Sequence, residues 1–259
     1  MILPDPAFAF SGFVVGMMVG QTGVGGGSLM TPLLVLLFGV HPATAVGTDL
    51  LFAAASKSVG TLVHGANHTV DWRVVGRLAT GSVPATILTV LVLSHYNAVS
   101  PEMGKVISVG LGIALVLTGG VLMLRRWFVA TVGPVMEGIT PCGRLCITIA
   151  CGAVLGVGVS ISSVGAGAIG VTALVLLYPE LPIARIVGSD IAHAVPLTLI
   201  AGVGHWWLGS VDWTLLGSLL SGAIPGIMLG SYLTRFVPEW VLRPLLAIVL
   251  FLVGGRMVV

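Results

Sequence analysis

The sequence predicts an all-α integral membrane protein made of two inverted repeats of about five hydrophobic segments each. Hydrophobic residues make up 56% of the 259 residues and charged residues only 8%. A soluble domain carries about 25% charged residues, so this chain has too few to cover a water-facing surface. Apolar stretches of the roughly 20 residues that a spanning helix needs recur along the chain. Clusters of residues in the first half also recur in the second.

Hydropathy divides the chain into ten apolar segments. The first two, and likewise the sixth and seventh, are short and separated by glycine-rich turns, which is typical of broken or re-entrant helices. The polar and apolar alternation of a membrane barrel is missing from the sequence. In chain order the segments are 7–21, 28–40, 44–66, 74–95, 103–124, 145–160, 168–178, 186–208, 214–234 and 240–258.

The two halves match at a constant offset of 141 residues. Gly-Thr-Asp at 47–49 recurs as Gly-Ser-Asp at 188–190, and Val-Asp-Trp at 70–72 recurs at 211–213. Across 41–85, 13 of 45 aligned positions are identical without a gap. Such self-similarity at a fixed spacing indicates a duplication.

An odd number of segments in each half predicts that the second half enters the membrane from the opposite side. Inverted repeats of this kind are typical of secondary transporters. If each short pair formed one broken span, the halves would be parallel instead. The predicted domains are a first membrane repeat (1–124), a cytoplasmic linker (125–144) and a second membrane repeat (145–259).

The basic residues predict the orientation, because cytoplasmic loops carry an excess of Lys and Arg. A cytoplasmic linker leaves only Lys105 and Arg256 on the outer side, and both termini then face outward. The residues placed on the cytoplasmic side are Arg73, Arg77, Arg125, Arg126, Arg144, Arg185, Arg235 and Arg243.

Two glycine-rich turns, 21–28 and 160–167, occupy corresponding places in the two halves. Glycine lets successive backbone N–H groups converge, and helix N-termini add the positive end of a dipole, so such turns bind anions. The alternative is close helix packing, which small residues also permit. The predicted substrate-binding residues in these turns are Gln21, Thr22, Gly25, Gly26, Gly27, Ser28, Ser162, Ser163, Gly165 and Gly167.

Lys57 and His193 are the predicted substrate-binding side chains that carry or gain a positive charge. An ionisable group deep in a membrane segment is expensive and is usually functional. Lys57 shares a helical stripe with Asp49, whereas the second half has Thr198 at the equivalent position. Counted along two oppositely directed helices, Lys57 and His193 both lie on the order of 4 Å to the cytoplasmic side of the midplane. The alternatives for Lys57 are extension to the interface and neutralisation by Asp49.

Four further residues are candidates for proton coupling or gating: Asp49, His64, Asp190 and His205. Each pair holds equivalent positions in the two halves. The alternative for the aspartates is helix capping, and for the histidines a hydrogen-bonded place at the interface. The three cysteines favour free thiols over a metal or disulfide framework. No cofactor and no metal site are expected.

The repeated motifs resemble those of the sulfite exporter TauE/SafE family. They are GVGGGSLMTP at 23–32, HPATAVGTDL at 41–50, the Val-Asp-Trp boundary and GSVPA at 81–85. The resemblance covers nearly the whole chain. It implies a carrier of sulfite, sulfonates or related organosulfur anions in a bacterial inner membrane. The family's glycine-rich motif carries over to 23–28 and 160–167, and the second copy departs from it at Ala166 and Ala168.

The expected function is gradient-driven, proton-coupled transport of a small sulfur-containing anion by alternating access, and not an enzymatic activity. The expected partners are this substrate and the lipid bilayer, with a homodimer as an option and no nucleic acid. An anion channel and a metal-ion carrier that uses the histidines are alternatives. An intramembrane hydrolase would need Asp49 and Asp190 to meet, and inverted repeats place them near opposite faces.

Overall fold

The structure is a computed structural model that describes residues 5–22, 27–96, 100–233 and 239–258. Within these residues every element is an α-helix, which satisfies the backbone hydrogen bonds inside each segment, as a bilayer interior requires. The helices are α1 (Pro6–Thr22), α2 (Gly27–Leu36), α3 (Pro42–Ala66), α4 (Trp72–Ser94), α5 (Pro101–Glu137), α6 (Pro141–Ser162), α7 (Ala168–Leu177), α8 (Ile183–Trp207), α9 (Trp213–Leu233) and α10 (Glu239–Val258).

Capping residues set where several of these helices begin. Asp71 accepts hydrogen bonds from the backbone N–H groups of Arg73 (3.0 Å) and Val74 (3.3 Å) at the start of α4. Asp212 does the same for the first turn of α9. Proline occupies the first position of α3, α5 and α6, where its fixed φ suits a helix and its missing N–H costs nothing.

Five of the described helices are long and apolar enough to cross a membrane: α4, α5, α6, α8 and α9. The chain is therefore a helical membrane protein that crosses the bilayer several times. The ten-residue helices α2 and α7 extend about 15 Å, half of the roughly 30 Å hydrocarbon core. They are the short helices predicted at the glycine-rich turns. The expectation of a short sixth segment is wrong, because α6 has 22 residues.

Helix α5 continues well beyond the apolar segment predicted at 103–124. It has 37 residues and ends at Glu137, a length of about 55 Å that exceeds the bilayer core. The pair Arg125–Arg126 ends the apolar run but not the helix, because arginine is a good helix former. Helix α6 then begins at Pro141, so much of 125–144 is helical.

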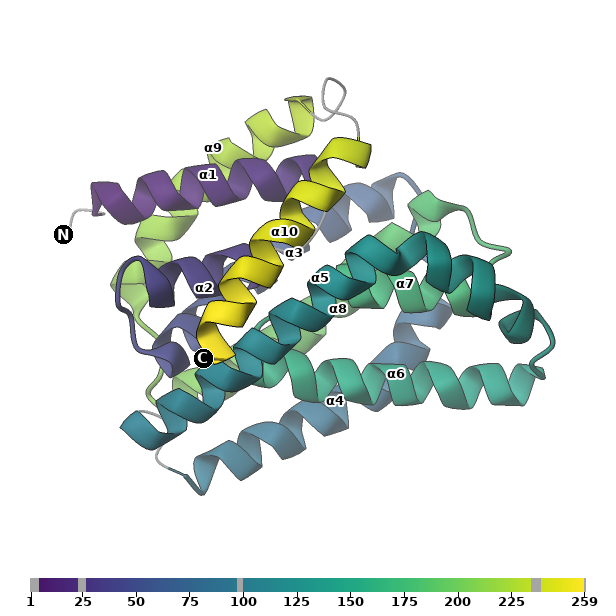
Figure 1. Ribbon diagram of the computed structural model, residues 1–259, viewed down its shortest axis with the longest axis horizontal. Helices are drawn as coiled ribbons and strands as arrows, with labels where there is room; N and C mark the ends of the chain where they lie inside the picture. The colour runs from purple at the N-terminus through teal and green to yellow at the C-terminus, as the bar shows by residue number, and fades with distance from the viewer. Residues whose placement is uncertain (1–4, 23–26, 97–99, 234–238, 259) are drawn as a thin grey trace.

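The helices pack in a pattern that is the same when the two halves are exchanged. Helix α1 lies beside α9, and the equivalent α6 lies beside α4. Helix α3 packs on its own equivalent α8, and α5 packs on α10 (Figure 1). The sequence repeat is thus also a repeat of contacts.

The two central helices, α3 and α8, run antiparallel. Gly47 near the start of α3 lies against His205 near the end of α8, and Gly60 lies against Ile191. Matching hydrogen bonds join the halves: the Asp71 N–H donates to Ser189 Oγ (2.8 Å), and the Asp212 N–H donates to Thr48 Oγ1 (3.1 Å). The two bonds are equivalent, because Asp71 corresponds to Asp212 and Thr48 corresponds to Ser189 at the 141-residue offset.

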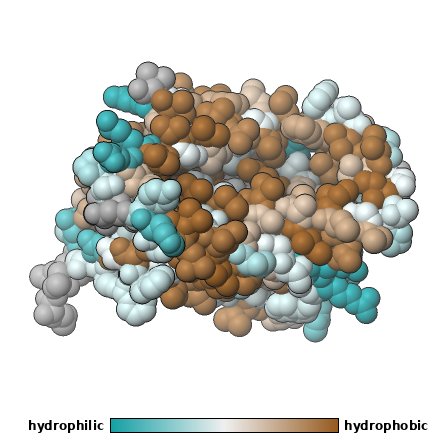
Figure 2. All heavy atoms as spheres, turned by 90° about the horizontal axis from the view of Figure 1, so that it is seen from below, coloured by the Kyte–Doolittle hydropathy of each residue, from teal (hydrophilic) through white to brown (hydrophobic). Residues whose placement is uncertain are grey.

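The outer surface is mainly apolar. Leu62, Met228 and Leu252 expose 74%, 71% and 71% of their surface. Figure 2 shows apolar side chains across most of one face, with hydrophilic side chains toward its ends. Such a surface suits lipid rather than water. Trp206 and Trp207, at the end of α8, are also exposed, as in the aromatic belts of membrane proteins.

Candidate functional site

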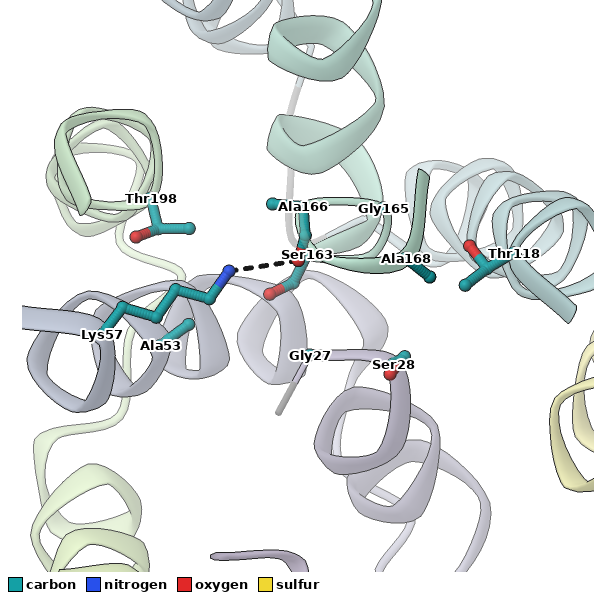
Figure 3. Close-up of a pocket in the computed structure, with 10 residues that line it drawn as sticks. All are labelled: Gly27, Ser28, Ala53, Lys57, Thr118, Ser163, Gly165, Ala166, Ala168 and Thr198. Carbon is teal, nitrogen blue, oxygen red and sulfur yellow. Dashed lines mark hydrogen bonds between the residues drawn. The ribbon is translucent and has the colours of Figure 1, made fainter. Parts of the chain in front are cut away.

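A small internal cavity lies where the short helices meet the two central ones. Its volume is about 10 Å³, which is room for about one water molecule. Helices α2, α3, α5, α7 and α8 and the turn between α6 and α7 all reach it (Figure 3). Its lining residues are Gly27, Ser28, Ala53, Lys57, Thr118, Ser163, Gly165, Ala166, Ala168 and Thr198.

Lys57 brings the ammonium group into this cavity. Its Nζ donates a hydrogen bond of 3.1 Å to the carbonyl oxygen of Ala166 (Figure 3). No carboxylate of the described residues lies within ion-pair distance of Lys57. Asp49 acts on Lys57 electrostatically from beyond this distance, so neutralisation by Asp49 stays an alternative. Among the described residues, the hydrogen-bond acceptor for this cation is a neutral backbone carbonyl.

The N-termini of α2 and α7 both reach the cavity. Gly27 and Ser28 begin α2 and line it, as does Ala168 at the start of α7. A Cβ at Gly27 would overlap the backbone carbonyl of Ser163, so the two glycine-rich turns touch directly. The turn before α7 has positive φ at Ser163 (57°), Gly165 (112°) and Gly167 (136°), a conformation that glycine adopts most easily.

Equivalent residues of the two repeats line the same cavity. Lys57 is equivalent to Thr198, and Gly27 is equivalent to Ala168. Both halves therefore contribute equivalent positions to the cavity. The hydroxyls of Ser163 and Thr118 are buried and have no hydrogen-bond partner among the described residues. The cavity thus offers an ammonium group and hydroxyl donors in a space lined by small side chains.

Asp49 and Asp190 lie close to the cavity but do not line it. Asp49 is fully buried and accepts a hydrogen bond of 2.5 Å from Thr31 of α2. Asp190 is 1% exposed and packs on Gly170 of α7. One oxygen of each carboxylate, Oδ1, has no hydrogen-bond partner among the described residues. Both aspartates lie inside their helices, so neither is the N-terminal cap that was the alternative.

The histidines point to separate places. His193 is buried and its Nε2 bonds with Ser82 of α4 at 2.8 Å, away from the cavity lining. His205 is satisfied on both ring nitrogens, by Ser210 Oγ (3.0 Å) and the Ser160 carbonyl (2.9 Å). His64 makes the equivalent bond to Thr69 Oγ1 (2.8 Å). His64 and His205 are thus hydrogen-bonded, as their alternative to proton coupling or gating expects.

The remaining predicted residues divide into three groups. Ser162 donates to the carbonyl of Gly158 (2.7 Å) and does not line the cavity. Gly167 precedes α7 as its cap. Gln21 and Thr22 end α1, but their side chains lie outside the described part of the chain, as do Gly25 and Gly26 entirely.

Thr118 and Thr198 line the cavity but were not predicted as site residues. Each is a single hydroxyl in an otherwise apolar helical stretch, and that isolation is the signal that could have found them. Thr31, the donor to Asp49, could have been found as a hydroxyl beside the proline of the first glycine-rich motif.

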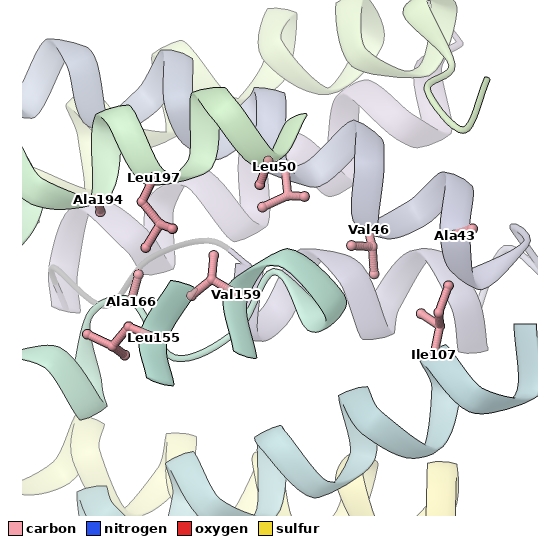
Figure 4. Close-up of a cluster of buried hydrophobic side chains, with 10 residues drawn as sticks. Ala43, Val46, Leu50, Ile107, Leu155, Val159, Ala166, Ala194 and Leu197 are labelled. Carbon is pink, nitrogen blue, oxygen red and sulfur yellow. The ribbon is translucent and has the colours of Figure 1, made fainter. Parts of the chain in front are cut away.

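Apolar and polar contacts join the helices around the cavity. One central apolar cluster packs α3, α5, α6 and α8 together and includes Val46, Leu50, Ile107 and Val159 (Figure 4). The hydroxyl of Tyr178, just after α7, accepts a hydrogen bond from Arg77 (3.3 Å) and bonds with Thr148 (2.9 Å).

Comparisons with known proteins show the family of this chain. The family model described as sulfite exporter TauE/SafE matches residues 8–257. The probable membrane transporter protein YjnA of Bacillus subtilis is 36% identical over 230 residues, which cover 88% of this chain and 90% of that protein. A probable membrane transporter protein of Xylella fastidiosa (strain 9a5c) is 29% identical over 229 residues, 87% of this chain and 84% of that protein. No solved structure matches. The chain is a membrane transporter and not an enzyme, and it belongs to the sulfite exporter TauE/SafE family.

Proposed function

We propose that this transporter carries a small sulfur-containing anion, such as sulfite or a small sulfonate, through the Lys57 cavity. The observation that supports this most is the position of Lys57, whose ammonium group meets the N-termini of both short helices. Helix N-termini and ammonium groups both stabilise negative charge. An oxyanion that replaced the Ala166 carbonyl as the acceptor for Lys57 would gain a charge-assisted hydrogen bond.

The lining favours a compact substrate. Apart from Lys57, the described residues that line the cavity are all glycine, alanine, serine or threonine. Phe52, an aromatic candidate for contact with an organic tail, is buried in another cluster with Met30 and Leu219. Trp206 and Trp207 are exposed. Sulfite and short-chain sulfonates therefore fit this site better than aromatic sulfonates do.

The small volume of the cavity favours alternating access driven by a gradient. A space for one water molecule is too small for a sulfur oxyanion, so the substrate must enter another conformation. The antiparallel course of α3 and α8 supports two inverted repeats, which rock against each other in many carriers. Protons are the proposed coupling ion, with the buried aspartates as their carriers.

The two alternative functions are a metal-ion carrier and an anion channel, and the positions of the histidines disfavour the metal-ion carrier. A metal-ion carrier would need several histidines at one place, but His64, His193 and His205 bond to different elements. An anion channel would need a path that is open to both sides of the membrane at once. It would then carry an anion current and would not exchange labelled for unlabelled substrate against a gradient.

The proposed location is a bacterial cell membrane, with both termini outside. The described arginines Arg73, Arg77, Arg144 and Arg185 then lie on the cytoplasmic side with Tyr178, in agreement with the positive-inside rule. A homodimer is compatible with the apolar outer surface.

Thermal unfolding of the purified protein tests the substrate class. Sulfite, sulfate, taurine, an aromatic sulfonate, phosphate and nickel are compared, since a ligand of the folded state raises Tm with concentration. We expect a sulfur anion to raise Tm in the wild type and in Lys105→Ala, which changes an exposed lysine, but not in Lys57→Ala. Stabilisation by nickel alone, or an equal response of Lys57→Ala, would contradict the proposal.

A further inference from the structure

Asp49 and Asp190 are a pair of buried carboxylates placed symmetrically about the transport site. They hold equivalent positions in α3 and α8, and they are the carboxylates among the buried polar residues of the described chain. The Oδ1 atom of each has no hydrogen-bond donor among the described residues. A buried carboxylate oxygen without a donor is costly as an anion, and it is available to accept a proton.

One cation serves both carboxylates. Lys57 interacts electrostatically with Asp190 and with Asp49, although neither lies within 4.0 Å of it. Two ionised carboxylates and one ammonium group leave one net negative charge around the empty site. A dianion that entered this site alone would raise the net charge to three negative charges. A low-dielectric interior strongly disfavours such an excess.

We propose that Asp49 and Asp190 are two proton-binding sites, filled from the same solution as the substrate anion, so that the number of protons equals the charge of the anion. This inference rests on the proposed function. Each proton adds to a carboxylate Oδ1 when the anion enters and leaves from it when the anion departs on the other side. A dianion with two protons, or a monoanion with one, leaves the charge around the site unchanged. Transport is then electroneutral.

The groups around the two carboxylates fit this role. Asp49 accepts a hydrogen bond from the Thr31 hydroxyl of α2. The Ser163 hydroxyl of the turn before α7 also interacts with Asp49, but not at hydrogen-bond geometry. Asp190 faces Gly170 of α7 and Lys57. His193, one helical turn from Asp190 on α8, is the other buried titratable group nearby, and its Nδ1 has no partner among the described residues.

Proteoliposomes containing the full-length protein test the proton count. Accumulation of labelled sulfite is measured above the second pKa of sulfite, with an imposed pH difference and the membrane potential held at zero. Protein-free vesicles give the passive leak. Each proton carried multiplies the accumulation by about ten per pH unit, since tenfold corresponds to about 1.4 kcal/mol. The same measurement is repeated with an imposed membrane potential.

We expect the wild type to accumulate sulfite about 100-fold per pH unit and to ignore the membrane potential. Asp49→Asn and Asp190→Asn should each fall to about tenfold and become sensitive to the potential, while Asp71→Asn, at a helix cap, should match the wild type. Tenfold or potential-driven accumulation by the wild type would overturn the inference even if neither Asn variant folds. So would loss of one proton in His193→Gln but in neither Asn variant. If the wild type moves no sulfur anion at all, the proposed function itself fails.

Discussion

Lys57 and Thr198 occupy equivalent positions in the two repeats and line one cavity, although their helices run antiparallel. One half therefore contributes a cation to the cavity, and the other half contributes a hydroxyl at the equivalent position. In the proposed function, the ammonium group gives this site its preference for anions. Substitutions that restore or mimic the symmetry are therefore informative.

Replacement of Lys57 by threonine makes the two halves alike at this position. We expect Lys57→Thr to fold, because Thr198 already occupies the equivalent site, but to weaken anion binding. Loss of a hydrogen bond from a charged donor costs about 1.5–3 kcal/mol, or roughly 10- to 100-fold in Kd. Isothermal titration with the stabilising anion measures this change. Thr198→Ser, which keeps the hydroxyl, should bind within about twofold of the wild type. Equal Kd values for Lys57→Thr and the wild type would refute the role of Lys57.

Gly27 has to be glycine because the two glycine-rich turns touch there. A Cβ at this position would overlap the Ser163 carbonyl, and overpacking of this kind costs about 1–3 kcal/mol. Gly27→Ala should therefore lower Tm and slow transport. The matched control is Gly76→Ala in α4, where a Cβ has open space and alanine favours the helix. If both variants have the same Tm, the turns do not touch as described.

We expect the Tyr178 hydroxyl to hold the proposed cytoplasmic side closed, because it bonds with Arg77 and Thr148. Tyr178→Phe removes these bonds and should ease opening by about 1 kcal/mol, or roughly fivefold. The measurement is the labelling rate of Thr198→Cys in a protein without its three native cysteines. Two of these, Cys142 and Cys146, are exposed and would react themselves. Tyr96→Phe, at an exposed tyrosine, is the control, and a fivefold rise there too would argue against a closing role.

The two hydrogen bonds that join the halves should contribute equally. Ser189 Oγ accepts the Asp71 N–H, and Thr48 Oγ1 accepts the Asp212 N–H. Ser189→Ala and Thr48→Ala should each lower the free energy of unfolding by about 1 kcal/mol. Chemical unfolding in detergent measures both values. If only one of the two variants lowers the free energy of unfolding, the two equivalent bonds do not contribute equally to stability.

Sequence periodicity predicts the broad fold here because the bilayer leaves few solutions. The short helices after the glycine-rich turns could be predicted because their apolar segments are too short to span a bilayer. The bonds of the Asp71 and Asp212 N–H groups join equivalent residues of the repeat, but their partners are seen only in the structure. The extension of α5 to Glu137 could not be predicted from hydropathy, because the apolar run ends before Arg125. The residues beyond it are still compatible with a helix. Lys57 was found from its depth, but the direction of His193, toward Ser82 rather than the cavity, depends on which neighbouring helix packs against that face.

Counterflow of labelled sulfite in proteoliposomes is the most direct test of the central claim, that Lys57 holds a sulfur anion in a carrier with alternating access. Vesicles loaded with unlabelled sulfite and diluted into a trace of labelled sulfite should take up label transiently above equilibrium. Lys57→Thr should abolish this overshoot, and Lys105→Ala should preserve it. Uptake without overshoot would indicate a channel, and an overshoot that survives in Lys57→Thr would contradict the assigned site.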